Sequence, residues 1–167
     1  MVSNFFIDLN NAKVGEQTVL HTLSTLAPHY TFIDTSSDPS YYHKGDIMAI
    51  DESGNKHFIE VKTDSRIAAT QNVLLEDAVD YYDSGKKPGN LHSNYEIYCV
   101  VSPQRHKVAI MDFSVLRAHA HEGTYKVIPH DEQTTYAYLL PIARIEQLGG
   151  IIAIIDYETN EVTYKRN

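Results

Sequence analysis

Two short segments rich in apolar residues stand on either side of a polar run. Residues 45–50 begin with a glycine and are mostly apolar, and residues 57–62 carry three apolar residues among polar ones. Residues 51–55 between them are almost all turn formers, so a hairpin of two antiparallel strands is expected. Side chains along a strand point alternately to the two faces of its sheet, and Glu60 and Lys62 therefore share one face.

The register of this hairpin decides whether a further acid joins that face. A turn centred on Ser53 places Asp46 opposite Glu60, and a turn centred on the next residue places it opposite Lys62. The register between these two turns Asp46 to the other face, because a slip of one residue reverses every side chain. Two interpretations stay open at this point: a cluster of reactive groups, or the solvated face of a half-buried hairpin.

A helical pattern precedes the hairpin. Apolar residues recur at helical spacing within residues 14–27, and a cap near Asn11 is expected. Glu16 lies four residues before Leu20 and seven before Leu23, near the centre of the apolar face. A carboxylate buried there needs a cation or hydrogen bonds. In the first turn it can equally interact with the helix dipole and reach solvent.

The remaining pattern predicts a mixed α/β chain with a central sheet. An exposed loop is expected over residues 84–90. Asp112 is a candidate N-cap, and Pro141 precedes a short helix that ends at Gly149 and Gly150. Strands are expected over residues 73–75, 96–101, 107–111, 125–128 and 136–140, a helix over 113–120, and a final hairpin over 151–155 and 161–164.

A helix with an inward Glu, then a strand, then Asp on one hairpin arm and Glu-x-Lys on the other resembles the PD-(D/E)XK nuclease superfamily, which includes restriction endonuclease-like and Holliday junction resolvase-like proteins. The resemblance covers about residues 10–76. It departs where Gly45 stands in place of a proline. It implies an α/β fold with a restriction endonuclease-like core, a central mixed sheet flanked by helices, in one domain over residues 1–167. The matching residues are Glu16, Asp46, Glu60, Val61 and Lys62.

The resemblance also implies a role for each of these residues. Asp46 and Glu60 would bind Mg²⁺ or Mn²⁺ together with the carbonyl of Val61. Glu16 would bind a second metal or orient a metal-bound water, and Lys62 would position or activate the attacking water. The residue types suit this chemistry, because Mg²⁺ prefers oxygen ligands and lysine donates to phosphate oxygens.

Several further residues are candidates for contacts with the substrate. Residues 70–76 are similar to the strand that follows the catalytic motif in several members of the superfamily, where a polar residue orients substrate or water. Gln71 and Asn72 are the candidates there. The tyrosine pairs at 41–42 and 81–82 can stack on bases or pack at the rim of the core. Basic residues either gather on the substrate side or form ordinary solvated surface: Lys13, Lys44, Lys62, Arg66, Lys86 and Lys87.

Composition and charge limit the function further. With 167 residues, 43% of them hydrophobic, one globular domain is expected. The chain has no long apolar run, its start lacks the features of a signal peptide, and its lone Cys99 fits a reduced compartment, so the cytoplasm is expected. The formal net charge of −8 argues against tight binding of nucleic acid, because such binding depends on positive charges that neutralise phosphates. A homodimer or a partner protein is therefore expected to assist.

Two functions from different classes follow from the sequence. The first is a metal-dependent phosphodiesterase, a DNA endonuclease that uses a metal-activated water. The second is a non-catalytic member of the same fold that binds nucleic acid or serves in assembly. The presence of every site residue favours the enzyme, and the acidic charge favours the second. An unrelated α/β domain remains if the hairpin takes the other register.

Overall fold

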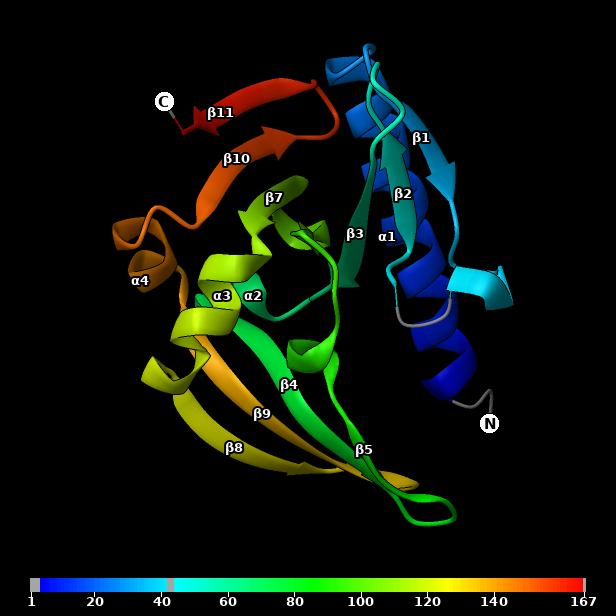
Figure 1. Ribbon diagram of the computed structural model, residues 1–167. Helices are drawn as coiled ribbons and strands as arrows, with labels where there is room; N and C mark the ends of the chain where they lie inside the picture. Colours follow the sequence, from blue (N-terminus) through cyan, green and yellow to red (C-terminus); the bar gives the residue numbers. More distant parts are fainter. Residues whose placement is uncertain (1–3, 42–43, 167) are drawn as a thin grey trace.

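The structure is a computed structural model that describes residues 4–41 and 44–166. A seven-stranded sheet forms its centre, and a smaller sheet lies beside it (Figure 1). In spatial order the strands of the larger sheet are β1 (Thr31–Asp34), β2 (Ile47–Ile50), β3 (Lys56–Thr63), β6 (Ile97–Ser102), β7 (Lys107–Asp112), β10 (Ile151–Asp156) and β11 (Glu161–Lys165). β3 and β6 are parallel and the other neighbours are antiparallel. The expected α/β class with a central mixed sheet is confirmed.

The smaller sheet contains a strand where the sequence predicts a loop. Its order is β5 (Gly85–Pro88), β4 (Asn72–Tyr81), β9 (Gln133–Pro141) and β8 (Thr124–Pro129). The prediction of an exposed loop over residues 84–90 is therefore wrong. Gly85 has a φ of +80°, which permits the sharp reversal from β4 into β5, and Pro88 stands on an edge strand where its missing N–H is tolerated.

Helix α1 (Asn4–Leu26) begins well before the expected cap at Asn11. Asparagine is only moderately unfavourable inside a helix, so its preference for a cap position does not by itself set the start. The helix packs against β3 and β1 (Figure 1). At Gly15 it approaches β3 so closely that an added Cβ would collide with the side chain of Thr63. This close approach brings the next residue, Glu16, to a cleft that residues of β3 also line.

The larger sheet has a hydrophobic core on each face. Val61 and Cys99 lie in the core under α1, together with Val19 of that helix. Tyr98 lies in the other core, to which α3 (Phe113–His119) contributes Phe113. Residues of even number in β3 therefore face the smaller sheet and residues of odd number face α1, which is the alternation of a strand buried on both sides. Cys99 is buried, as its apolar surroundings in the sequence predict.

The remaining elements agree with most of the expected boundaries. Asp112 is the N-cap of α3 and accepts a hydrogen bond of 3.0 Å from the N–H of Ser114. α4 (Ile142–Gln147) follows Pro141 and ends before Gly149, whose φ is +69°. None of the described helices is long and apolar enough to cross a membrane. The other helical segments are α2 (Ile67–Thr70), α4 (Ile142–Gln147) and the 3₁₀ turns η1 (Pro39–Tyr41), η2 (Asn90–His92), η3 (Pro103–Arg105) and η4 (Ala120–Glu122).

Candidate metal centre and adjoining clefts

The hairpin of β2 and β3 takes a register centred on Ser53. Ile47 pairs with Ile59. Directly before this pair, the N–H of Asp46 donates to the carbonyl of Ile59 at 2.9 Å, so Asp46 lies beside the part of β3 that carries Glu60. Asp46 and Glu60 line the same two clefts.

Gly45 fixes the backbone that leads into Asp46. Its φ is +136°, and a Cβ there would lie 2.8 Å from the carbonyl oxygen of Ile59. The Thr35 hydroxyl donates to the Gly45 carbonyl at 3.0 Å, and the Thr35 N–H donates to the Asp46 carbonyl at 2.8 Å. The residue that departs from the superfamily pattern is thus one that this backbone requires to be glycine.

The backbone of Val61 faces the carboxylate of Asp46. The Val61 N–H donates to Oδ2 of Asp46 at 2.8 Å. The N–H and the carbonyl of one strand residue point to the same side of the strand, so the Val61 carbonyl is directed to that side as well. Asp46, Glu60 and the Val61 carbonyl thereby bring together three groups with oxygen atoms, the kind of ligand that Mg²⁺ and Mn²⁺ prefer.

Burial makes negative charge costly at this pair of acids. It raises the pKa of Asp46 to about 6, with a contribution from Glu16, against the hydrogen bond from Val61. It also raises the pKa of Glu60 to about 8, where the neighbouring Asp46 adds to the effect. A cation bound between the two carboxylates would remove this repulsion. Among the described residues no three His, Cys, Asp or Glu side chains converge, so any ion here would complete its shell with the Val61 carbonyl, water or phosphate oxygens.

Lys62 is held beside the acids by a residue of the smaller sheet. Its Nζ lies 3.5 Å from Oε1 of Glu76 on β4. Burial favours the neutral amine, but the carboxylates of Glu76, Glu60 and Asp46 outweigh burial and raise the pKa of Lys62. The lysine is therefore a protonated donor at neutral pH. Glu76 is the last residue of the segment 70–76. The sequence makes the amides of Gln71 and Asn72 the candidates in that segment and does not predict the contact of Glu76 with Lys62.

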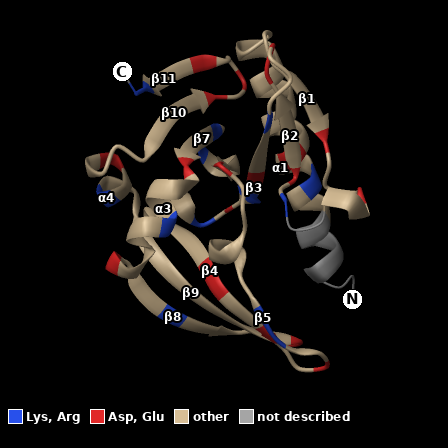
Figure 2. Ribbon diagram, viewed as in Figure 1, with Lys and Arg blue, Asp and Glu red and all other residues tan. Residues whose placement is uncertain are grey.

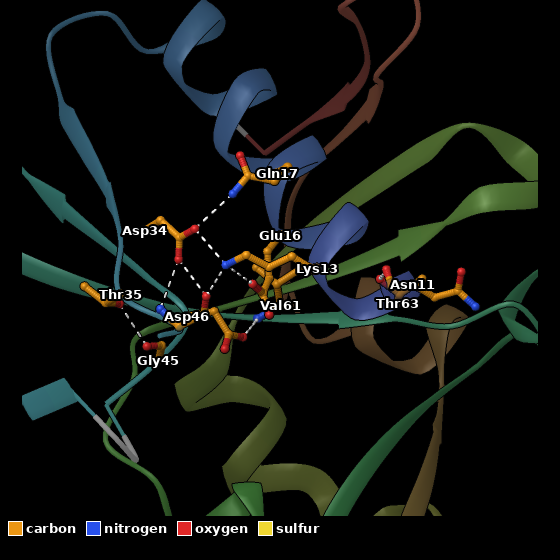
Figure 3. Close-up of polar contacts among 11 residues, drawn as sticks. Asn11, Lys13, Glu16, Gln17, Asp34, Thr35, Gly45, Asp46, Val61 and Thr63 are labelled. Carbon is orange, nitrogen blue, oxygen red and sulfur yellow. Dashed lines mark hydrogen bonds and ion pairs between the residues drawn. The ribbon is translucent and has the colours of Figure 1, made fainter. Parts of the chain in front are cut away.

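Glu16 faces the sheet, with only 13% of its side chain exposed. Its Oε2 lies 3.1 Å from the Nζ of Lys13, one helical turn earlier, and accepts no hydrogen bond within the described chain. Lys13 also donates to Asp34 at the end of β1 (Figure 3). Of the two alternatives for Glu16, the low exposure of its side chain agrees with the inward one, and its role as a metal ligand stays a prediction.

Two clefts meet at Asp46 and Glu60. The larger, of about 700 Å³, is also lined by Glu16, Val61 and Lys62. The smaller, of about 330 Å³, is lined by residues of η1, β4 and β5, among them Glu76, Tyr41, Tyr81 and Lys87. The pair of acids is thus reached from both sides. Tyr42, the other half of one tyrosine pair, lies outside the described residues.

The candidate substrate residues are spread around this centre. The side-chain amide of Gln71 donates to Ala68 at 2.8 Å, and that of Asn72 donates to Thr70 at 2.7 Å, so both amides cap the end of α2. Lys44 is exposed and lies over the ring of Tyr41, with Nζ 5.6 Å from its centroid. Arg66 is exposed beside the larger cleft, which its neighbour Ser65 lines. Figure 2 shows Lys and Arg distributed over α3, α4, β5 and β8, and they do not gather along one element.

Comparison with known proteins gives a remote likeness in fold. No family model and no curated protein matches the sequence. Among solved structures, the fold is similar to a bacterial homing endonuclease, I-Ssp6803I, with a TM-score of 0.46 and 9% identity over 75% of this chain and 74% of that one.

Proposed function

We propose that the protein is a metal-dependent DNA endonuclease of the PD-(D/E)XK type, which hydrolyses the phosphodiester backbone. The observation that carries the proposal is the hydrogen bond from the Val61 N–H to the carboxylate of Asp46, in a cleft that Asp46, Glu60 and Val61 line together. The same strand supplies Lys62 on the face of Glu60. A solvated hairpin would not require two partly buried acids whose pKa values are raised.

Each residue of the site has its own role in the proposed hydrolysis. Asp46, Glu60 and the Val61 carbonyl would hold Mg²⁺ or Mn²⁺. When bound, the ion supplies a water of lowered pKa and neutralises charge on the phosphate. Lys62, protonated because its pKa is raised, donates to a phosphate oxygen or to the attacking water as charge grows in the transition state. Glu76 holds the Lys62 ammonium in place.

The smaller cleft is the proposed path for the nucleic-acid strand. Lys87 and Tyr81 of the β4–β5 hairpin line it together with Tyr41 from the other side. A lysine can bind phosphate there, and tyrosine rings can stack on bases. Since the chain carries a net charge of −8 and its basic residues are dispersed, a second copy or a partner protein would supply further positive charge.

A cleavage panel tests this function. Purified protein is incubated with labelled single-stranded, duplex and branched DNA and with the matching RNAs, in Mg²⁺, Mn²⁺ or EDTA. We expect cleavage of a DNA substrate that requires the metal and is lost in Asp46→Asn. Metal binding at Asp46 without cleavage of any substrate would favour the non-catalytic member of the fold, which the acidic charge also favours. Cleavage that persists in Asp46→Asn would contradict the proposal.

A further inference from the structure

The Nζ of Lys13 is surrounded by oxygen atoms from three residues. It lies 2.8 Å from Oδ2 of Asp34, 2.6 Å from Oγ of Ser36 and 3.1 Å from Oε2 of Glu16 (Figure 3). Asp34 and Ser36 come from the end of β1 and the segment after it, whereas Lys13 and Glu16 come from α1. The ammonium therefore links the helix to the edge strand of the larger sheet.

The oxygens around Lys13 are positioned by further hydrogen bonds. Oδ1 of Asp34 accepts from the N–H of Ser36 at 3.1 Å and from its hydroxyl at 2.6 Å. Oδ2 of Asp34 accepts from the side-chain amide of Gln17 at 2.9 Å. The hydrogen bond to Asp34, with the charge of Glu16, raises the pKa of Lys13, so this lysine is a fixed positive charge. The arrangement is a built site for one cation, and the chain fills it itself.

This site adjoins the candidate metal centre. Glu16 lines the same cleft as Asp46 and Glu60. Its charge acts on Asp46 to raise the pKa of that acid, and the charge of Lys13 acts on Asp46 in the opposite direction. Lys13 and Glu16 thus lie close enough to Asp46 to influence an ion bound there, without having to coordinate it.

We propose that Lys13 takes the place of a second divalent cation between Glu16 and Asp34, so that the site holds a single metal ion at Asp46 and Glu60. This inference rests on the proposed function and specifies its metal stoichiometry. Glu16 is then a positioning residue: its carboxylate holds Lys13 and adjusts the field at Asp46, and it is not a ligand. The carboxylates available to a second ion are already neutralised by an ammonium that is part of the chain.

Counting bound Mn²⁺ tests the inference. The EPR signal of free Mn²⁺ is followed while the metal alone is titrated into wild type, Lys13→Met, Lys13→Arg and the control Lys126→Met. We expect one bound ion in wild type, Lys13→Arg and Lys126→Met, and two in Lys13→Met, where the positive charge is lost. Lys126 is a suitable control because it is an exposed lysine on β8, away from the two clefts.

The possible results separate the inference from the function on which it rests. Two ions in the wild type, or one ion in a folded Lys13→Met, would overturn the single-ion inference and leave a metal-dependent nuclease in place. No Mn²⁺ bound by the wild type would overturn the metal centre itself and this inference with it. Glu16→Gln serves if Lys13→Met does not fold. It should keep one ion with less than about a tenfold change in affinity, and loss of that ion would show that Glu16 is a ligand.

Discussion

Two neighbouring groups of acids differ in how their negative charge is compensated. Asp34 and Glu16 have Lys13 between them, and the hydrogen bonds from Lys13 and Ser36 outweigh burial and lower the pKa of Asp34. At Asp46 and Glu60 burial dominates instead, and both pKa values are raised.

One group is compensated within the chain and the other is not. One group is complete within the chain, because the helix supplies its own ammonium. The other group has a lysine nearby, but Lys62 is paired with Glu76 of the smaller sheet. A metal ion would do for Asp46 and Glu60 what Lys13 does for Asp34 and Glu16.

Removal of Lys62, the lysine beside Asp46 and Glu60, should have the largest effect on cleavage. We expect Lys62→Ala to lower the rate of single-turnover DNA cleavage by about a hundredfold or more, because a donor to the transition-state charge is lost. Metal and DNA binding should be largely kept, since protonated lysine is not a ligand. Lys56→Ala, on the same strand but exposed, is the control. Near-equal rates for Lys62→Ala and wild type would show that Lys62 is not catalytic.

Loss of the carboxylate that holds Lys62 should have a smaller effect. We expect Glu76→Gln to slow cleavage roughly tenfold, since Lys62 is then less well placed. Glu76 helps to raise the pKa of Lys62, so in the variant that pKa falls and the alkaline limb of the pH–rate profile moves to lower pH. Asp77→Asn, one residue along β4, should leave the profile unchanged. An unshifted limb in Glu76→Gln would mean that Glu76 does not act through Lys62.

Replacement of Glu60 by a neutral residue should stabilise the metal-free protein, and this gain over wild type should grow as the pH rises. The folded-state pKa of Glu60 is about 8, above its ordinary value of 4.5. Between these values the folded protein keeps a proton that the unfolded chain has released, so stability falls as the pH rises through this window. Glu60→Gln mimics the protonated form. Its free energy of unfolding should match wild type at pH 5 and exceed it by on the order of 1 kcal/mol at pH 8.

Thermal unfolding in EDTA at the two pH values measures this difference. Glu146→Gln, an exposed acid of α4, provides the control and should show the same small change at both values. An equal effect of Glu60→Gln at pH 5 and pH 8 would indicate that Glu60 is ionised in the folded protein throughout the range. The site would then have no uncompensated charge for a metal to relieve.

The exposed basic residues near the clefts should contribute least. We expect Lys44→Ala and Arg66→Ala each to weaken DNA binding a few-fold on every sequence and to reduce the salt dependence by about one phosphate contact. Gln71→Ala should change neither binding nor cleavage, because its amide donates to the end of α2. Fluorescence anisotropy at several salt concentrations measures these effects. A salt slope unchanged in both charge variants would exclude these residues from the interface.

The sequence predicts the hairpin site because its geometry is local. Alternation along a strand places Glu60 and Lys62 together, and a short polar turn leaves few registers for Asp46. The helical stripe likewise places Glu16 inward. The roles that depend on bound metal, such as the Val61 carbonyl as a ligand, remain predictions.

The contacts that the sequence does not reveal join elements far apart in the chain. Lys13 contacts Asp34 on another element, and Glu76 reaches Lys62 from the smaller sheet. No periodicity links such residues, because their meeting depends on how helices and sheets pack. The strand β5 escapes prediction for a similar reason: its residues read as a loop, and pairing with β4 makes them a strand.

Calorimetry of Mn²⁺ binding to matched variants of the two acid groups tests the central claim most directly. Wild type, Asp46→Asn and Asp34→Asn are titrated under the same conditions at pH 7.5. We predict that Asp34→Asn binds Mn²⁺ as wild type does, whereas Asp46→Asn loses binding. Binding that survives in Asp46→Asn and is lost in Asp34→Asn would place the ion at the group that holds Lys13, and would contradict the account.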